Sequence, residues 1–260
     1  MTRKRVFLLS VTLCCLTACS GAASRYSAIN GHSHNDYKNE APFRLAYERR
    51  FGSIEADIWV SSGGLYVAHY ENEIRPERTL DALYIEPIAE AFRRNGGAPW
   101  KGDTDSFQLL VDLKSPAEPA LSMLIARLSR YPEVFDARVN RRAVRVVITG
   151  NRPVDMDKYP DIVSFDGESG REYDKAQLKR IALFSGDFRR FSSWSGTGPM
   201  AADEKLRVRK AVDSAHALKK KIRFWNAPDG PEAWERLMDM GVDLINTDRV
   251  AELADYLNRR

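Results

Sequence analysis

The chain has 260 residues, of which 43% are hydrophobic and 29% are charged, as in an ordinary globular protein. This composition excludes a disordered chain, a collagen and a polytopic membrane protein. The 40 Lys and Arg exceed the 36 Asp and Glu by four, and Arg3, Lys4 and Arg5 supply most of that excess. The remaining chain is nearly balanced in charge, so no broad basic surface indicates binding to nucleic acid or anionic lipid.

The amino-terminal segment has the parts of a secretion signal. The three basic residues precede an apolar run at 6–16, which is too short for a membrane span because a spanning helix needs roughly 20 residues. Leu16-Thr17-Ala18-Cys19 then resembles a bacterial lipobox, in which the cysteine becomes the lipidated first residue. We predict a lipoprotein signal peptide at 1–18, lipidation of Cys19 and a tether at 19–27. An ordinary cleaved signal and a buried first helix are the alternatives.

This interpretation predicts a protein of the bacterial cell envelope, anchored through Cys19 to the outer membrane or the periplasmic face. The only thiols are Cys14, Cys15 and Cys19, and cleavage before Cys19 removes the first two. The mature chain then has no disulfide, so a hydrophobic core must hold it together.

Short apolar or β-branched runs alternate with amphipathic stretches along the remaining chain. Strands are predicted at residues 28–34, 53–60, 107–114, 143–150, 162–166, 181–185, 222–226 and 243–247. Helices are predicted at residues 42–51, 81–95, 117–131, 173–180, 202–220, 231–240 and 250–259. Strands that alternate with helices pair in parallel, and eight such units fit a closed (β/α)₈ barrel of the α/β class. We predict one barrel domain at 28–260, with an open doubly wound sheet as the alternative.

Two stretches interrupt this alternation. Gly63-Gly64 lies between two apolar runs and predicts a hairpin beyond the second strand. The segment 187–200 follows the sixth strand and is rich in Ser, Gly and aromatic residues. It is either a solvated connection or a substrate lid that carries Trp194.

Acidic residues fall at a spacing of two in predicted strands. Glu55 and Asp57 therefore point to the same face, and Asp112 and Lys114 repeat this geometry on the third strand. Carboxylates held together inside a barrel are costly unless a cation neutralises them, which favours Mg²⁺ or Ca²⁺. Lys114 can offer a charge to a phosphate oxygen. The alternatives are solvated acids on an edge strand and, for Asp112 with Lys114, a salt bridge at the barrel mouth.

Two histidines border the same predicted mouth. His34 ends the first strand and His69 ends the hairpin, so one can accept a proton while the other donates one. His216 lies in a helix rich in Ala and Lys, and we assign it no role.

Together these residues resemble a known superfamily. His34 before Asn35-Asp36, Glu55-x-Asp57, His69 after a Gly turn and Asp112-x-Lys114 are similar to the glycerophosphodiester phosphodiesterase-like, or PLC-like, superfamily of metal-dependent (β/α)₈ barrels. Phe224-Trp225-Asn226 and Asn246-Thr247-Asp248 fit its last two strands, so the resemblance covers most of the predicted barrel. His-Asn-Asp-Tyr and Arg-Phe-Trp-Asn look most like the group named for the altered inheritance of mitochondria protein six. The Asp-x-Lys pair also resembles sphingomyelinase D.

The resemblance implies a role for each matched residue. His34 and His69 would be the acid and base, and Glu55, Asp57 and Asp112 would hold one divalent cation, Mg²⁺ or Ca²⁺. Substrate would contact Lys114, Trp225 and Asn226, with Trp225 as a wall of the pocket. Glycerophosphodiesterases carry Arg where this chain has Asn35, and their Glu-Asn-Thr segment is missing. The resemblance therefore implies phosphodiesterase chemistry without specifying the alcohols.

We therefore predict an exported, metal-dependent phosphodiesterase that cleaves a phosphodiester of a lipid or lipid-derived head group. A substrate hydroxyl or water would attack phosphorus, and no protein partner is implied. Two alternatives remain. One is a metal-dependent amidohydrolase or phosphoesterase in which His32-x-His34 binds the metal, although later strands supply few histidines for such a site. The other is a non-enzymatic lipoprotein that binds a ligand on a degenerate barrel.

Overall fold

The structure is a computed structural model, and it describes residues 26–260. The predicted signal peptide, Cys19 and most of the tether lie outside the described residues. Among the described helices, none is both long and apolar enough to cross a membrane.

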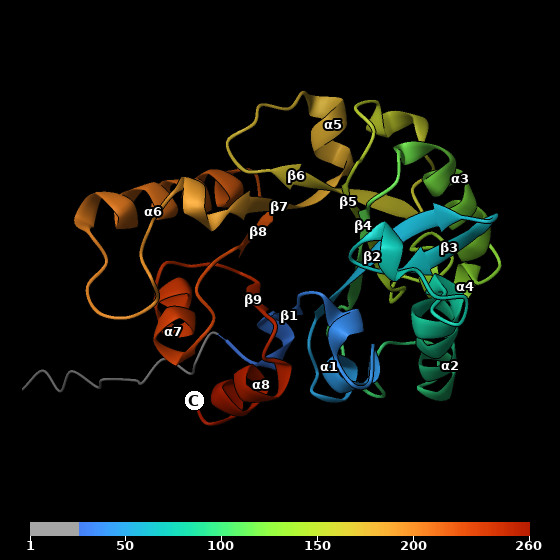
Figure 1. The fold of residues 1–260 in the computed structure, drawn as a ribbon, viewed down its shortest axis with the longest axis horizontal. Coiled ribbons are helices and arrows are strands. Elements are labelled where there is room, and N and C mark those ends of the chain that lie inside the picture. Colours follow the sequence, from blue (N-terminus) through green and yellow to red (C-terminus); the bar gives the residue numbers. More distant parts are fainter. Residues whose placement is uncertain (1–25) are drawn as a thin grey trace, which may run out of the picture.

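Eight parallel strands form a nearly closed barrel (Figure 1). A parallel bridge between Arg223 and Leu244 brings the two ends of the sheet together. The prediction of a (β/α)₈ barrel is confirmed, and the open sheet is wrong. In spatial order the strands are β8 (Lys221–Trp225), β7 (Ile181–Asp187), β6 (Val163–Glu168), β5 (Arg145–Gly150), β4 (Gln108–Leu113), β2 (Ser53–Ser61), β1 (Gly31–Ser33) and β9 (Ile245–Thr247).

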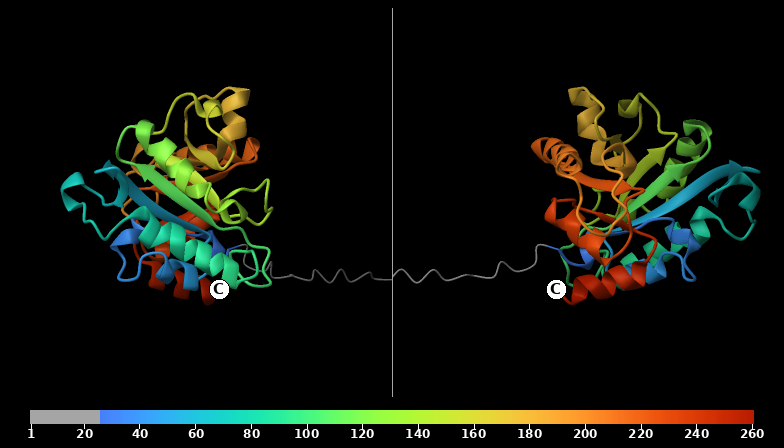
Figure 2. Two further views of the ribbon diagram at one scale, coloured as in Figure 1. Left: turned by 90° about the vertical axis from the view of Figure 1, so that its right-hand side faces the viewer. Right: turned by 60° about the vertical axis from the view of Figure 1, so that its left-hand side comes forward.

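Helices surround this barrel in the views of Figures 1 and 2. They are amphipathic: in α2, for example, Ile88, Ala89 and Phe92 are buried while Glu90 and Arg94 are exposed. The helices are α1 (Arg44–Glu48), α2 (Glu86–Arg94), α3 (Ala117–Leu128), α4 (Pro132–Phe135), α5 (Lys175–Arg180), α6 (Ala202–Ala217), α7 (Pro231–Asp239) and α8 (Val250–Asn258).

Some elements differ in extent from the prediction, and one short helix was not predicted. Residues Ala28–Asn30 form a 3₁₀ turn, so the first strand is shorter than predicted. A π-helical turn at Asp81–Ile85 precedes α2 within the predicted helix 81–95. The short helix α4 was not predicted, and it begins with Pro132, whose fixed φ suits a first helical position. Between β5 and β6 the chain forms only a 3₁₀ turn at Met156–Lys158.

The strands place apolar and polar residues in successive layers inside the barrel. Leu110, Val147, Leu183 and Leu244 form a small buried cluster, separate from the larger core. Because side chains alternate along a strand, residues two positions further on share the face of this cluster. Those positions hold Asp112, Thr149, Ser185 and Asn246. On these four strands, the inward face therefore changes from apolar to polar toward the carboxyl ends.

The predicted hairpin is present. Strand β3 (Gly64–Val67) pairs antiparallel with β2, and the hairpin projects from one side of the barrel in Figure 2. Gly63 has φ +74°, a conformation that glycine adopts without steric cost. The backbone amide of Ala68 donates to the carbonyl of Asp57 (3.2 Å), which places His69 beside the second strand.

The segment after β7 packs around its own tryptophan. Trp194 is only 8% exposed, and its indole N–H donates to the carbonyl groups of Thr197 and Gly198. Trp194 lines a smaller cavity that also contacts His34 and Asn226. The segment thus forms a wall beside the barrel mouth, with its aromatic side chain turned into the loop.

Candidate active site

A cavity of about 570 Å³ opens at the carboxyl ends of the strands. This is the end at which enzymes of this barrel type carry their active sites. The structure brings to this cavity all of the catalytic, metal-binding and substrate-binding candidates predicted from the sequence: His34, Glu55, Asp57, His69, Asp112, Lys114, Trp225 and Asn226.

Three carboxylates converge on one side of the cavity. Glu55, Asp57 and Asp112 each offer a ligand atom, and these atoms lie within 4.8 Å of one another. Glu55 and Asp57 are buried, and the Asp112 side chain is 19% exposed. Asp57 Oδ1 is buried without a hydrogen-bond partner among the described residues. Such a set of oxygen ligands, with one buried oxygen free, fits a divalent cation such as Mg²⁺ or Ca²⁺.

Two basic side chains contact these carboxylates. The Lys114 ammonium donates to Asp57 Oδ2 (3.0 Å) and to Asp112 Oδ2 (2.9 Å). The Arg223 guanidinium donates to Glu55 Oε2 (2.6 Å). Burial alone would raise the pKa of Glu55, but Arg223 and the contact with His32 hold it well below its usual range. Burial and the charge of Asp57 raise the pKa of Asp112, although Lys114 opposes this shift.

Asp57 also orients one of the two histidines. Its Oδ2 lies 2.9 Å from His69 Nδ1 and accepts a hydrogen bond from the Tyr37 hydroxyl (2.8 Å). A carboxylate at Nδ1 favours the proton on that nitrogen. The other ring nitrogen, Nε2, is then available to accept a proton.

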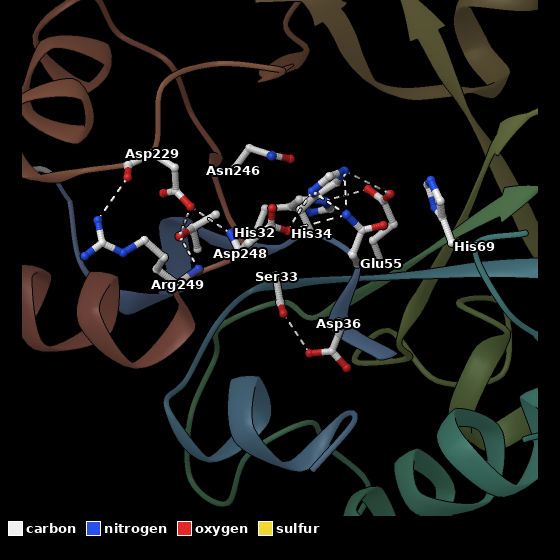
Figure 3. Close-up of polar contacts among 12 residues, drawn as sticks. His32, Ser33, His34, Asp36, Glu55, His69, Asp229, Asn246, Asp248 and Arg249 are labelled. Carbon is white, nitrogen blue, oxygen red and sulfur yellow. Dashed lines mark hydrogen bonds and ion pairs between the residues drawn. The ribbon is translucent and has the colours of Figure 1, made fainter. Parts of the chain in front are cut away.

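Asp248 contacts the second histidine in the same way. Its Oδ1 lies 2.9 Å from His34 Nδ1, while His34 Nε2 lies 3.8 Å from Glu55 Oε1. Figure 3 shows Glu55 between His34 and His69. Burial lowers the pKa of His34, but the hydrogen bond to Asp248 and the charge of Glu55 outweigh burial, so the pKa lies above its ordinary value.

His32 does not form a metal site with His34. His32 is fully buried, with Nδ1 2.6 Å from Ser53 Oγ and Nε2 2.6 Å from Arg223 Nη1. Burial, followed by the charge of Arg223, lowers its pKa to about 4. In the described part of the chain, the group of side chains placed to hold a metal contains only carboxylates. The geometry thus does not support the two-histidine alternative.

Trp225 and Asn226 lie at the rim of the cavity. Trp225 is 39% exposed, as a pocket wall would be. Asn226 has φ +54°, and its side-chain amide donates to Asp187 Oδ1 (3.2 Å). Its amide is therefore directed toward the neighbouring strand end.

The sequence analysis assigned no role to Arg223, Asp248 or Tyr37, which contact the predicted residues directly. Each had a signal in the sequence, because all three lie in the stretches that carry the resemblance. Arg223 is two positions before Trp225 on β8 and so shares its inward face. Its partner Glu55, however, is 168 residues away in the chain.

Gly150 shapes the carboxylate cluster. Its φ is +70°, and a Cβ at this position would lie 2.0 Å from Asp112 Oδ1. We predict that Gly150→Ala displaces Asp112 and weakens Mg²⁺ or Ca²⁺ binding by about tenfold or more, measured by calorimetry. Gly170→Ala is the matched control, because Gly170 has φ +87° with no atom near the added Cβ. Equal affinities of the two variants would contradict this role.

The hydrogen bond to Asp248 is the strongest of the contacts that raise the pKa of His34. We predict that Asp248→Asn lowers the His34 pKa in the metal-free protein, because the substitution removes a negative charge 2.9 Å from the ring. Histidine NMR titration measures this shift directly. A raised pKa of His34 stabilises the fold at pH values below the pKa of histidine in the unfolded chain, about 6.5. This stabilisation is lost as the pH rises through the pKa of His34 in the folded protein. Asp248→Asn should therefore destabilise the protein more at pH 5 than at pH 9. An unchanged titration would refute the assignment.

Comparison with known proteins identifies the family. A model described as the AIM6-like phosphodiesterase domain matches residues 22–162, and one described as the glycerophosphoryl diester phosphodiesterase family matches residues 221–251. The Altered inheritance of mitochondria protein 6 homolog of Arthroderma benhamiae is 28% identical, over 86% of this chain and 82% of that protein. Altered inheritance of mitochondria protein 6 of Saccharomyces cerevisiae is also 28% identical, over 91% of this chain and 73% of that protein.

Solved structures share the fold. A glycerophosphodiester phosphodiesterase from Parabacteroides distasonis has a TM-score of 0.51 at 19% identity, over 88% of this chain and 96% of that one. A phosphodiesterase from Oleispira antarctica, in complex with the product sn-glycerol-3-phosphate, has a TM-score of 0.50 at 10% identity. The match covers 88% of this chain and 95% of that one.

These comparisons correct one prediction and confirm another. The curated relatives are fungal, and their eukaryotic origin contradicts the predicted location in a bacterial cell envelope. The resemblance to the group named for the altered inheritance of mitochondria protein six is confirmed. Because the first family model matches more than half of its residues, the chain belongs to the family of AIM6-like phosphodiesterase domains.

Proposed function

We propose that this phosphoric diester hydrolase uses one divalent cation, held by Glu55, Asp57 and Asp112, and two histidines, His34 and His69, as its acid and base. The observation that carries the proposal is the convergence of these three carboxylates and the two imidazoles on one cavity. Membership in a phosphodiesterase family makes the chain an enzyme, so the non-enzymatic alternative is set aside.

The charges of the cluster suit a diester. Three carboxylates, Lys114 and Arg223 together carry one net negative charge. A divalent cation would reverse this to one positive charge, which matches the single negative charge of a phosphodiester. When bound, the cation would neutralise the phosphate and stabilise the charge that develops in the transition state. A phosphomonoester carries nearly two negative charges at neutral pH and is matched less well.

The two histidines supply the proton transfers. Each has a carboxylate at Nδ1, Asp248 for His34 and Asp57 for His69, which leaves Nε2 of both rings for substrate. One ring takes the proton of the attacking hydroxyl or water, and the other protonates the departing oxygen. The nucleophile therefore does not have to come from the enzyme.

The walls of the cavity favour a hydrophilic substrate. Lys38, Arg152, Glu168, Asp187 and Arg190 all line it, and Trp225 is its one large apolar side chain. Such walls accept a polar head group more readily than an acyl chain. We therefore infer a substrate derived from a lipid head group, with the phosphate near Lys114.

A panel of candidate substrates tests this assignment directly. Glycerophosphodiesters are its first members, because the Oleispira phosphodiesterase of similar fold was solved with sn-glycerol-3-phosphate. Lysophospholipids and sphingomyelin extend the panel to substrates with acyl chains. Phosphorus NMR of the products distinguishes a monoester from a cyclic phosphate. Cleavage restricted to the acylated substrates would overturn the head-group assignment.

Metal dependence is tested with bis(p-nitrophenyl) phosphate. We predict turnover with Mg²⁺ or Ca²⁺, loss of activity on chelation, and much slower turnover of p-nitrophenyl phosphate. Glu55→Gln, Asp57→Asn and Asp112→Asn should each reduce the rate by orders of magnitude, because each removes a charged oxygen ligand. Diester turnover that survives both chelation and these substitutions would exclude the proposed metal site.

The histidine pair is tested with two kinds of leaving group. We predict that His34→Ala and His69→Ala each lower kcat on an unactivated diester by about 10² to 10⁴. The double variant should lose less than the product of the two losses, because the rings act as a unit. A p-nitrophenolate leaving group needs little protonation, so it should rescue only the variant that lacks the acid.

His216→Ala is the control for the histidine pair. His216 lies on α6, where its Nε2 is 2.8 Å from Asp243 Oδ2, and it does not line the cavity. This variant should retain full activity. Wild-type rates for both His34→Ala and His69→Ala would remove the proposed mechanism.

A further inference from the structure

Arg223 is a cation enclosed by the barrel. It lies on β8, is 4% exposed, and reaches the floor of the cavity. A buried guanidinium requires compensating partners, because the loss of hydration is costly. Arg223 has them on several strands: Nε donates to Ser185 Oγ on β7, and Nη1 donates to Glu55 on β2 and to Asn246 on β9.

His32 packs against the same pair of charges. Arg223 Nη1 lies 2.6 Å from His32 Nε2, and this nitrogen also lies 3.0 Å from Glu55 Oε2. His32 Nδ1 lies 2.6 Å from Ser53 Oγ. The contacting carboxylate that balances the charge of Arg223 is that of Glu55.

The two oxygens of Glu55 have different surroundings. Oε2 contacts Arg223 (2.6 Å) and His32 (3.0 Å), both of which are buried. Oε1 faces His34 at 3.8 Å. Arg223 therefore holds one oxygen of a carboxylate whose other oxygen remains available to the metal cluster.

We propose that Arg223 is a resident counter-ion that shares Glu55 with the metal. It balances Glu55 when no metal is bound, so the metal-free barrel keeps its carboxylates in place. Its charge also repels a bound cation, which weakens metal binding and permits exchange. Arg223 is thus a positioning residue that sets the charge of the site. The inference rests on the carboxylate site of the proposed function.

The test removes the charge of Arg223 and measures metal binding without substrate. Arg223→Met should lower the melting temperature in the presence of a chelator, because Glu55 loses its counter-ion. The same variant should bind Mg²⁺ about tenfold more tightly or better by calorimetry, because a positive charge near the cation is gone. Arg223→Lys keeps a charge and should stay close to the wild type in Mg²⁺ affinity. Unchanged or weaker Mg²⁺ binding by Arg223→Met would overturn the proposal.

Two further variants separate charge from packing. The double variant Glu55→Gln, Arg223→Met removes both charges and should recover most of the metal-free stability lost by Arg223→Met, even if the single variant fails to fold. No recovery would mean that Arg223 acts through packing, against the proposal. Arg180→Met is the control, because Arg180 is 13% exposed and donates to the carbonyl groups of Tyr159, Pro160 and Val163. It should lower stability without changing Mg²⁺ affinity.

These measurements distinguish the inference from the proposed function. Mg²⁺ binding and metal-free stability are measured with no substrate present, so they do not depend on which diester is cleaved. A wild-type protein that binds Mg²⁺ but cleaves no diester would refute the proposed function and leave the role of Arg223 intact. A catalytically active protein whose Mg²⁺ affinity is insensitive to Arg223→Met would refute the role of Arg223 and leave the proposed function intact.

Discussion

Repulsion among three carboxylates inside the barrel is the constraint on which the site depends. Glu55, Asp57 and Asp112 lie where little water can screen them, so each needs a positive charge or a hydrogen-bond donor nearby. Lys114 serves two of them and Arg223 serves the third. One oxygen of each carboxylate lies within 4.8 Å of the others, and this arrangement favours a divalent cation.

The alternation of side chains along the strands makes this arrangement possible. On β4, Leu110 and Asp112 share one face. The same strand therefore contributes an apolar side chain to the small buried cluster and a carboxylate to the cavity. The same step of two residues relates Val147 to Thr149 and Leu183 to Ser185. These apolar side chains exclude water beside Glu55 and beneath Asp112, which strengthens the charge interactions there.

The sequence was sufficient to predict which residues lie together when they are close in the chain or at a fixed spacing in a strand. Glu55 and Asp57 are two apart on one strand, and the glycine turn before β3 returns the chain so that His69 reaches Asp57. The roles of Arg223 and Asp248 could not be found in this way. Their partners, Glu55 and His34, are 168 and 214 residues away, and they meet only because the sheet closes into a barrel.

The differences between the predicted and the observed elements also have physical reasons. Ala28–Asn30 has an apolar pattern that fits a strand, yet it forms a 3₁₀ turn in which the Asn30 side chain accepts from the backbone of Ser27. Such local hydrogen bonds compete with strand pairing. The helix α4 has only four residues, too few for a hydrophobic period to be recognised. Both differences lie away from the carboxylates and leave the site unchanged.

The two basic residues of the carboxylate cluster differ in their freedom to move. Lys114 is 23% exposed, and its ammonium is a point charge on a flexible stem, so it can leave the carboxylates for a phosphate oxygen. Arg223 is 4% exposed and is tied through Nε and Nη1 to three other strands, so it cannot follow the substrate. Metal binding would release Lys114 from carboxylates that the metal then neutralises, whereas Arg223 would keep its contact with Glu55. The division of Lys and Arg between these positions thus fits the substrate contact proposed for Lys114 and the counter-ion role proposed for Arg223.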